Sequence, residues 1–251
     1  MHPWIRSLYK RFRHRVTHTT KFPKGDLISS LLNLEDRGFR PRHIIDVGAN
    51  HGKWSRKAHR IFPDCVFTLV EPQIEMKPFL EEFCQRVPGS RWIQAGAAAA
   101  SGHLSFTVIP DTVSSTFTLS EEQAEAEGFH RRLVSVVTLD ELVQDGYPVP
   151  DLVKIDAEGF EAEVMKGASS LIGKTELFLL EAPLIDPPPR WLSFAEIVSL
   201  MVGYGYEPYD FTSFQKRPYD GALGLCEIAF ARKRGILREF GGWDARVPKA
   251  A

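Results

Sequence analysis

Charged residues interrupt and follow a short apolar run in the second half of the chain, where Lys154, Asp156 and Glu158 stand close together. Side chains alternate along a strand, so Lys154 and Asp156 are expected on one face and Val153 and Ile155 on the other. A lysine in a buried strand is costly unless it is paired, which predicts an ion pair with Asp156 or another carboxylate. A structural ion pair at a strand end would explain the same residues. The chemical interpretation makes Asp156 and Glu158 the first candidates for a general base.

A glycine turn follows another apolar run, in the segment D-V-G-A-N-H-G at residues 46–52. Gly48 permits a tight turn and a close backbone approach to a ligand, and Gly52 lets the next helix pack near the strand. The dinucleotide fingerprint requires three glycines, and this segment has two. The pattern therefore favours a ligand smaller than a dinucleotide, such as an adenosyl amino acid, although a glycine turn can follow any strand.

An acidic residue ends the next apolar run, in the dipeptide Glu71-Pro72. Glu71 lies 19 residues after Gly52, where an acid can accept hydrogen bonds from both hydroxyls of a ribose. NAD and S-adenosylmethionine would both use such an acid. Glu71 therefore predicts a ribose site without choosing between the two cofactors.

Apolar periodicity, caps and breakers place these residues on alternating strands and helices. Helices are expected over 26–38, 54–62, 76–86, 160–172 and 193–202, with two shorter ones opened by capping boxes at Ser120 and Thr138. Strands are expected at 43–47, 65–70, 91–97, 104–109, 133–137, 152–155, 176–180, 207–211 and 226–231. This alternation predicts an α/β fold with a mostly parallel sheet covered on both faces, and a ligand crevice at the carboxyl ends of the strands.

Several segments together resemble the FkbM family of S-adenosylmethionine-dependent methyltransferases. They are D-V-G-A-N-x-G (46–52), V-E-P (70–72), T-L-D-E-L (138–142) and K-I-D-A-E-G-F-E (154–161), followed by V-M-K-G-A (164–168) and L-L-E (179–181). The resemblance covers about residues 40–233. The chain departs from the family at Cys226-Glu227, where an aspartate usually precedes the apolar part of the final strand.

The resemblance implies a Rossmann-like class I methyltransferase fold, with a mostly parallel seven-stranded sheet, an antiparallel last strand and helices on both faces. It implies S-adenosyl-L-methionine as the cofactor and O-methylation of a hydroxyl on a sugar, glycan or natural product. The implied cofactor contacts are Gly48, Asn50 and Gly52 around the methionine moiety, Glu71 with Pro72 at the ribose, and Asp46 and Asp156 near the methionine amino group.

Other functions and other bases stay open at this point. An NAD-dependent oxidoreductase would share the glycine turn and the ribose acid, and a non-catalytic adenosyl-binding protein would share the fold. His51 and His103 are weaker candidates for the base. Carboxylates could also hold a divalent cation, with Asp156 joined by Glu158 or Glu181. Since the sequence has no diagnostic metal spacing, no metal is predicted.

The acceptor is expected to contact the segments that are insertions in this pattern, at 112–118, 121–128, 186–190 and 211–224. Aromatic side chains in or near them could face a sugar or a planar ligand, although core packing would equally explain any one of them. They are Trp191, Tyr209, Phe211, Phe214 and Tyr219.

Charge is divided unevenly along the 251 residues, whose formal net charge is −1. Residues 1–25 carry seven basic residues and no acid, which leaves 24 basic against 32 acidic residues in 26–251. We therefore expect a basic N-terminal arm and a single domain over 26–251. Apolar residues in the arm are spaced for an amphipathic helix, which could lie on an anionic membrane surface or on a partner chain. The acidic body would repel phosphates, so no specific nucleic acid partner is expected.

The cellular setting is predicted from absences in the sequence. The three cysteines are odd in number and widely spaced, which argues against a disulfide framework or a structural zinc site. Apolar runs fall short of the roughly 18 residues of a spanning helix, and the N-terminus lacks the apolar stretch of a signal peptide. We expect a cytoplasmic protein, peripheral to a membrane if the arm binds one.

Overall fold

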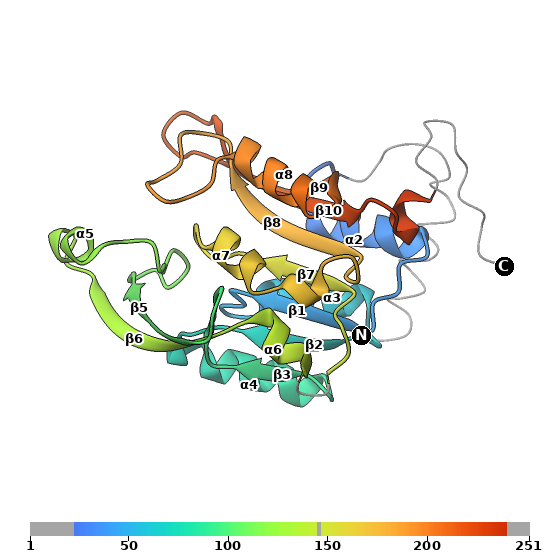
Figure 1. The fold of residues 1–251 in the computed structure, drawn as a ribbon, viewed down its shortest axis with the longest axis horizontal. Coiled ribbons are helices and arrows are strands. Elements are labelled where there is room, and N and C mark those ends of the chain that lie inside the picture. Colours follow the sequence, from blue (N-terminus) through green and yellow to red (C-terminus); the bar gives the residue numbers. More distant parts are fainter. Residues whose placement is uncertain (1–22, 145–146, 240–251) are drawn as a thin grey trace.

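The computed structural model describes residues 23–144 and 147–239, which form a central twisted sheet between helices (Figure 1). The sheet has seven strands in the order β3-β2-β1-β7-β8-β10-β9. Their bounds are β1 His43–Val47, β2 Val66–Val70, β3 Arg91–Ile93, β7 Leu152–Ile155, β8 Leu177–Pro183, β9 Tyr206–Lys216 and β10 Leu223–Arg232. Of the predicted basic arm, residues 1–22 lie outside the described residues.

The direction of the strands confirms the predicted sheet. β1 pairs in parallel with β2 and β7, and β7 pairs in parallel with β8. β10, the last strand in the chain, is antiparallel to both β8 and β9. The strand order reverses between β1 and β7, so the carboxyl ends of these two strands flank the switch point, where open α/β sheets bind their ligands.

Two apolar layers hold the helices on opposite faces of the sheet. The face that carries Ile44 and Phe67 packs against α2 Leu27–Asp36, α3 Lys53–Ile61 and α4 Lys77–Arg86. The other face, with Ile45 and Val153, packs against α6 Leu139–Gln144, α7 Glu161–Lys166 and α8 Phe194–Gly203. Neighbouring residues of one strand enter different layers because side chains alternate across a sheet. β1 and β7 are buried along their whole length, as parallel strands covered on both faces should be.

The expected strand over 91–97 is wrong as a single element. β3 ends at Ile93, the Ala95 N–H turns back to the Ile93 carbonyl at 2.9 Å, and residues 96–97 join a second sheet. That sheet has the order β4-β6-β5, from β4 Gly96–Ala97, β5 Gly102–Val108 and β6 His130–Val137. With α5 Glu121–Ala126 between β5 and β6, it projects to one side of the main sheet in Figure 1.

The helix expected over 160–172 is shorter than predicted. α7 ends at Lys166, and a 3₁₀ turn at Ser169–Leu171 follows. The break falls at Gly167, where a Cβ would lie 2.1 Å from the carbonyl oxygen of Ala98. A side chain at this position would collide with the backbone of the neighbouring loop, so the residue after the helix must be a glycine.

Most helix starts follow the predicted caps. Asp26 accepts the Ser29 N–H at the start of α2, and full capping boxes open α5 at Ser120 and α8 at Ser193. The Thr138 hydroxyl accepts the Glu141 N–H at 3.1 Å at the start of α6. The last two strands are found where predicted and are longer than expected. Short 3₁₀ turns also occur at Ile74–Met76 and Ile236–Arg238.

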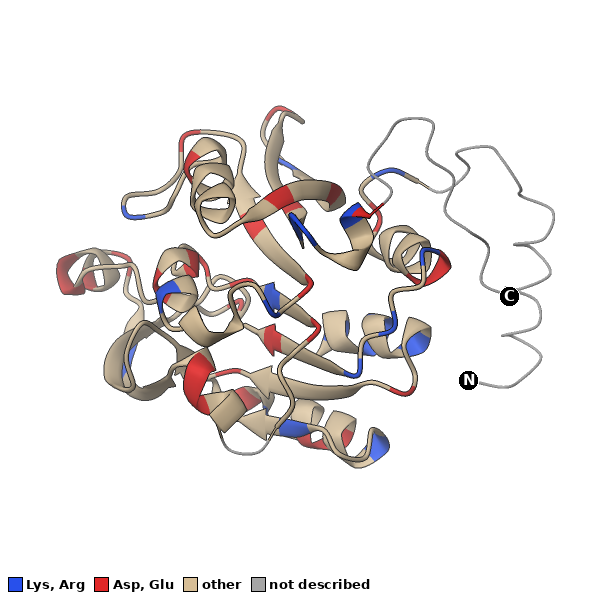
Figure 2. Ribbon diagram, turned by 45° about the vertical axis from the view of Figure 1, so that its right-hand side comes forward, with Lys and Arg blue, Asp and Glu red and all other residues tan. Residues whose placement is uncertain are grey.

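Acidic and basic residues are spread over most elements of the fold, as the coloured segments of the ribbon show (Figure 2). Many of them form exposed pairs, such as Arg86 with Glu82 and Lys77 with Glu81. Pairs of this kind contribute little to stability. In the part of the chain that the structure describes, no helix is both long and apolar enough to cross a bilayer.

Phe178 offers a test of the second apolar layer. Its side chain is fully buried on β8, with the ring of Tyr206 edge-on at 4.9 Å between centroids. Phe178→Ala should lower the free energy of unfolding by about 3–5 kcal/mol, because buried apolar area is lost and a cavity remains. Urea denaturation would measure this. Leu133→Ala, at a residue with 71% exposure, is the control and should change stability little; equal effects would contradict this account of the core.

Candidate active site

The turn after β1 lies directly against the end of β7. Gly48 has a φ of +69°, and a Cβ there would lie 1.8 Å from the carbonyl oxygen of Asp156. Only glycine allows both this conformation and this approach. The turn leads through Asn50, at φ +45°, to Gly52, which begins α3 at φ +68°. The predicted glycine turn thus lies at the carboxyl edge of the sheet, between the ends of β1, β2 and β7.

Glu71 lies at the end of β2 with its carboxylate turned toward this turn. One carboxylate oxygen accepts the Asn50 N–H and the other accepts the Gln73 N–H, both at 2.9 Å. The residue is 3% exposed. Burial raises its pKa, and the two backbone hydrogen bonds oppose that shift. Glu71 is therefore held rigidly in the position where a ribose acid is predicted.

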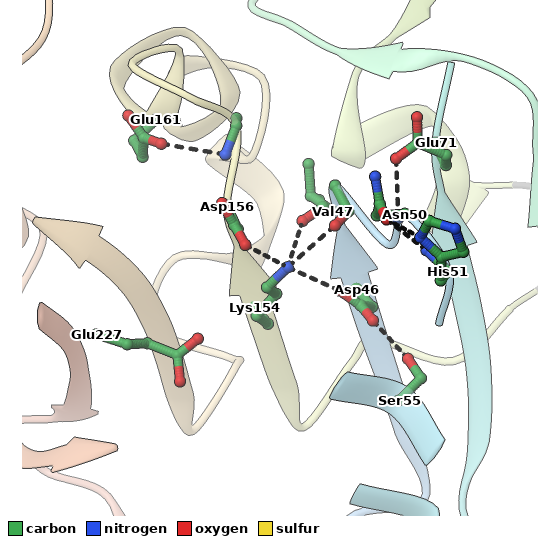
Figure 3. Close-up of polar contacts among 12 residues, drawn as sticks. Asp46, Val47, Asn50, His51, Ser55, Glu71, Lys154, Asp156, Glu161 and Glu227 are labelled. Carbon is green, nitrogen blue, oxygen red and sulfur yellow. Dashed lines mark hydrogen bonds and ion pairs between the residues drawn. The ribbon is translucent and has the colours of Figure 1, made fainter. Parts of the chain in front are cut away.

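Lys154 is the buried centre of the site (Figure 3). Its ammonium nitrogen lies 3.3 Å from Asp46 Oδ1 and 3.1 Å from Asp156 Oδ2. It also donates to the carbonyl oxygens of Val47 at 3.3 Å and Gly48 at 3.1 Å. Burial alone would lower its pKa, but the attraction of the two aspartates raises the pKa above its usual value. The predicted pairing of Lys154 with a carboxylate is confirmed, and it involves two.

Asp46 lies deeper than its expected role near the methionine amino group requires. It is completely buried and accepts a hydrogen bond from the Ser55 hydroxyl as well as pairing with Lys154. Asp156 is different, because 38% of its side chain is exposed and it lines the cavity at the strand ends. Of the two aspartates, Asp156 is therefore the one that a ligand can touch, and Asp46 acts on the site through Lys154.

Three carboxylates gather beside this cavity. Oxygen atoms of Asp156, Glu158 and Glu181 lie within 4.8 Å of one another. Burial and the charge of Asp156 raise the pKa of Glu158 to about 8. Burial, with Asp156 and Glu158, raises the pKa of Glu181 to about 9. Glu158 and Glu181 therefore hold protons at neutral pH, and any positive charge placed beside them will favour their ionised forms.

Two further glutamates support the cluster without lining the cavity. Glu161 is buried and accepts the N–H groups of Ala157 at 3.1 Å and Gly159 at 3.4 Å, which shapes the loop that carries Glu158. Glu227 on β10 pairs in register with Glu181 on β8 and accepts a hydrogen bond from Thr212. The departure from the family pattern at Cys226-Glu227 thus still places an acid close to Lys154, whose pKa Glu227 helps to raise.

A cavity of about 70 Å³ occupies the strand ends. Its walls include Gly48, Asn50, Glu71, Pro72, Asp156 and Glu158. Gly52 and Asp46 are not among them. A larger, open hollow of about 440 Å³ lies beside α8, lined mainly by apolar groups such as Leu192 and Leu200. Because that hollow has no cluster of carboxylates among its described lining residues, we assign the site to the smaller cavity.

The two predicted histidines lie away from the carboxylate cluster. His51 packs on Phe79, with 4.6 Å between ring centroids, and contacts the side-chain oxygen of Asn50. His103 lies on β5 with its Nε2 atom 3.5 Å from the Ser135 hydroxyl. Neither lines the cavity. The structure therefore favours a carboxylate over either histidine as the base.

The sequence pattern does not single out Gln73, and it includes Phe117 only as part of the segment 112–118 expected to contact the acceptor. Gln73, two residues after Glu71, is 3% exposed and contacts the loop that follows β5. Phe117, from that same loop, lines the cavity and packs against Phe160 at 5.2 Å. The only sequence signal for Gln73 is its position just past the end of β2. Nothing local in the sequence indicates that the loop folds back over it.

Comparison with known proteins agrees with this geometry. Residues 46–208 match the methyltransferase FkbM domain. The chain belongs to the FkbM methyltransferase family. This assignment favours S-adenosylmethionine over NAD and decides against the oxidoreductase alternative. The match contains the glycine turn, Glu71, the Lys154 segment and the Glu181 strand, whereas Glu227 on β10 lies beyond the matched residues.

One curated relative is the hexuronic acid methyltransferase AglP of Haloferax volcanii, 31% identical over 151 residues. The alignment covers 57% of this chain and 57% of the relative's length. Among solved structures, the N-methyltransferase NodS of Bradyrhizobium japonicum with bound S-adenosylhomocysteine has a TM-score of 0.48 at 7% identity, covering 82% of this chain and 85% of that one. The precorrin-6y C5,15-methyltransferase of Geobacter metallireducens has a TM-score of 0.46 at 13% identity, covering 86% and 93%.

Lys154 provides a test of the buried charge network. Lys154→Met would leave the buried Asp46 and the partly exposed Asp156 without their counter-charge, and an unpaired buried charge typically costs about 3–5 kcal/mol of stability. Urea denaturation at neutral pH should show this loss. Asp46→Asn combined with Lys154→Met should recover part of it, since one unpaired charge is removed.

The control for this test is Lys166→Met, which removes an exposed lysine paired with Glu163 on α7. Its unfolding midpoint should stay close to that of the unaltered chain. Equal losses from both lysines would show that the charge network does not carry the stability assigned to it.

Proposed function

We propose that this chain transfers a methyl group from S-adenosylmethionine to a hydroxyl of a sugar or glycan acceptor. The observation that carries the proposal is the carboxylate cluster of Asp156, Glu158 and Glu181 at the same strand ends as the glycine turn and Glu71. The relative AglP acts on a hexuronic acid, which supports a sugar as the acceptor.

The side chains around the cavity fit this cofactor by their chemistry. S-adenosylmethionine, when bound, supplies a methyl group already activated by a positively charged sulfur. Glu71 offers carboxylate oxygens for a ribose, and Pro72 lines the cavity beside it. Asp156 offers a partly exposed carboxylate for an ammonium group. Gly48, Asn50 and Gly52 form the turn that would face the amino acid portion.

The role of the chain in the reaction is to position and to accept a proton. An alkyl hydroxyl is a weak nucleophile, so a nearby base aids it. Glu158 is our first candidate, because it lines the cavity and because burial and the charge of Asp156 raise its pKa to about 8, and Asp156 is the second. Lys154 holds Asp156 in place, and Asp46 with Ser55 holds Lys154. Positioning supplies much of the rate when the methyl donor is already activated.

Isotope-labelled S-adenosylmethionine tests this function directly. The chain is incubated with the labelled donor and with glycosides of glucuronic acid and of glucose, and mass spectrometry follows the label. We expect label on a glycoside hydroxyl and at least a hundredfold loss with Asp156→Asn or Glu158→Gln. Glu163→Gln on α7 is the matched control and should keep its activity. Binding of S-adenosylhomocysteine without transfer to any sugar would reject the sugar acceptor and leave the cofactor assignment standing.

A chelator separates direct proton transfer from a metal-assisted reaction. The three carboxylates of the cluster are close enough to share a divalent cation, but the sequence predicts none. Activity should persist in excess chelator if Glu158 or Asp156 acts directly on the acceptor. Complete loss that magnesium restores would assign the cluster to a metal instead.

The pH dependence follows from the raised pKa of Glu158. A base must be ionised to accept a proton, so kcat/KM for S-adenosylmethionine should fall about tenfold per pH unit below pH 8. The midpoint in kcat should lie lower, because a bound cation favours the ionised carboxylate. Initial rates between pH 6 and 10 would show both. A profile without a step in this range would argue against Glu158 as the base.

A further inference from the structure

The cavity at the strand ends is much smaller than the ligand assigned to it. It measures about 70 Å³, whereas pockets for small-molecule ligands typically have about 300–1,000 Å³. Part of its wall comes from the loop after β5, through Val113, Ser115 and Phe117. The other walls are the strand ends and the glycine turn, which the buried network holds in place, and Gly96, Ala97 and Phe106, which are paired within the second sheet. The loop is therefore the wall that can move.

The tip of this loop, residues 109–115, which we call the strap, is held over the cavity by two side-chain amides. The backbone carbonyl of Thr112 accepts from Asn50 Nδ2 at 2.8 Å and from Gln73 Nε2 at 2.9 Å. The Ser115 hydroxyl donates to Gln73 Oε1 at 3.3 Å. Asn50 and Gln73 lie on either side of the Glu71 carboxylate. The backbone N–H group of each donates a hydrogen bond to that carboxylate. The strap thus occupies donors that surround the predicted ribose position.

The root of the strap is fixed separately from its tip. Thr116 and Thr107 exchange backbone hydrogen bonds of 2.9 and 3.1 Å, and the Thr116 hydroxyl donates to the Glu158 carbonyl at 2.8 Å. In Figure 1 the loop before α5 reaches from the small sheet toward α7. The tip has little apolar burial of its own, since Val113 is 59% exposed. A segment with a fixed root and few buried contacts at its tip can open locally.

The strained backbone of Thr112 and the hydrogen bonds of the Gln73 amide bear on how the strap could be displaced. Thr112 has a φ of +60°, an unfavourable conformation for a β-branched residue, so the closed tip is held against local strain. Gln73 is 3% exposed, and its amide would lose both strap partners when the tip leaves. The open strap uncovers this amide, so its donor and acceptor become available to a bound ligand or to water.

We propose that the strap and S-adenosylmethionine compete for the side-chain amides of Asn50 and Gln73, and that the cofactor displaces the strap when it binds. Gln73 thereby becomes a cofactor-binding residue, and residues 109–115 become the gate of the pocket. The strap stays displaced while the cofactor is bound, because its anchoring donors and its space are both taken. This inference rests on the cofactor site of the proposed function and not on the identity of the acceptor.

A pair of substitutions at Thr112 tests the gate. Thr112→Pro cannot adopt a positive φ and loses the 2.8 Å hydrogen bond from the Thr112 N–H to Ile109, so the closed tip should no longer form. Thr112→Gly keeps the positive φ and the carbonyl. For the full chain binding S-adenosylhomocysteine, the proline variant should associate at least tenfold faster and bind correspondingly tighter, with dissociation unchanged. The glycine variant should stay within about twofold of the unaltered chain.

Hydrogen exchange on the unaltered chain gives a second measurement that does not depend on a variant folding. Amides of residues 109–115 should exchange at least fivefold faster with S-adenosylhomocysteine bound, while those of β10 stay unchanged. Equal association rates for the proline and glycine variants, or strap amides that become protected on binding, would overturn the gate. A chain that binds no S-adenosylhomocysteine would overturn it together with the cofactor site. Gated binding without methyl transfer to any sugar would support the gate and count against the sugar acceptor alone.

Discussion

A single buried ammonium group ties the two strands that build the site. Lys154 on β7 lies in register with Asp46 on β1, and its nitrogen reaches two carboxylates and two carbonyl oxygens at the point where both strands end. Buried ion pairs are poor sources of stability, because desolvation of the charges offsets their attraction. In this protein the ion pairs of Lys154 serve to fix the positions of the groups around it. The carbonyls of Val47 and Gly48 belong to the glycine turn, so the same nitrogen fixes the turn, the exposed Asp156 and the gap between them.

Strain in the backbone marks the same region. The described residues other than glycine that have positive φ are Asn50, Thr112, Glu158 and Arg190. Asn50 and Glu158 line the cavity, and Thr112 anchors the strap to it. Arg190 contacts the carbonyl of Thr118 at 3.4 Å, just past the strap. Such conformations persist only where surrounding contacts over-determine them. Here those contacts are Glu71, the two side-chain amides and the hydroxyl of Thr116, which together hold the loops in one closed arrangement.

Local pattern was enough to predict the parts of the site that come from strand ends. The bounds of β1 and β7 agree residue for residue with the apolar runs at 43–47 and 152–155, since both strands are buried on both faces. The pairing of Lys154 followed from alternation and from the cost of burying a charge. Positions that depend on distant backbone could not be predicted. The residue after α7 must be Gly167 because of the Ala98 backbone, and the strap meets Gln73 across about forty residues of chain.

The expected strand at 91–97 failed for a related reason. Its composition suits a strand throughout, and only the tertiary structure sends residues 96–97 to the second sheet, where Gly96 packs under Phe117. Because β4 separates from β3, the second sheet forms beside the cavity, and the strap extends from β5 of that sheet. Where two sheets part is decided by packing between segments far apart in the chain, and a local pattern carries no information about it.

Part of the acidic excess of residues 26–251 is gathered at this cavity. Glu158 and Glu181 crowd together beside Asp156 and one buried lysine, and burial with the charges of neighbouring carboxylates raises the pKa values of these two glutamates to about 8 and about 9. A positively charged cofactor beside them would lower those pKa values and ionise the base when the methyl donor is present. Because linkage is reciprocal, the same coupling makes cofactor affinity rise with pH as the cluster loses its protons. The strap and the raised pKa values of Glu158 and Glu181 meet at the same cavity, so the proposed cofactor binding would act on both.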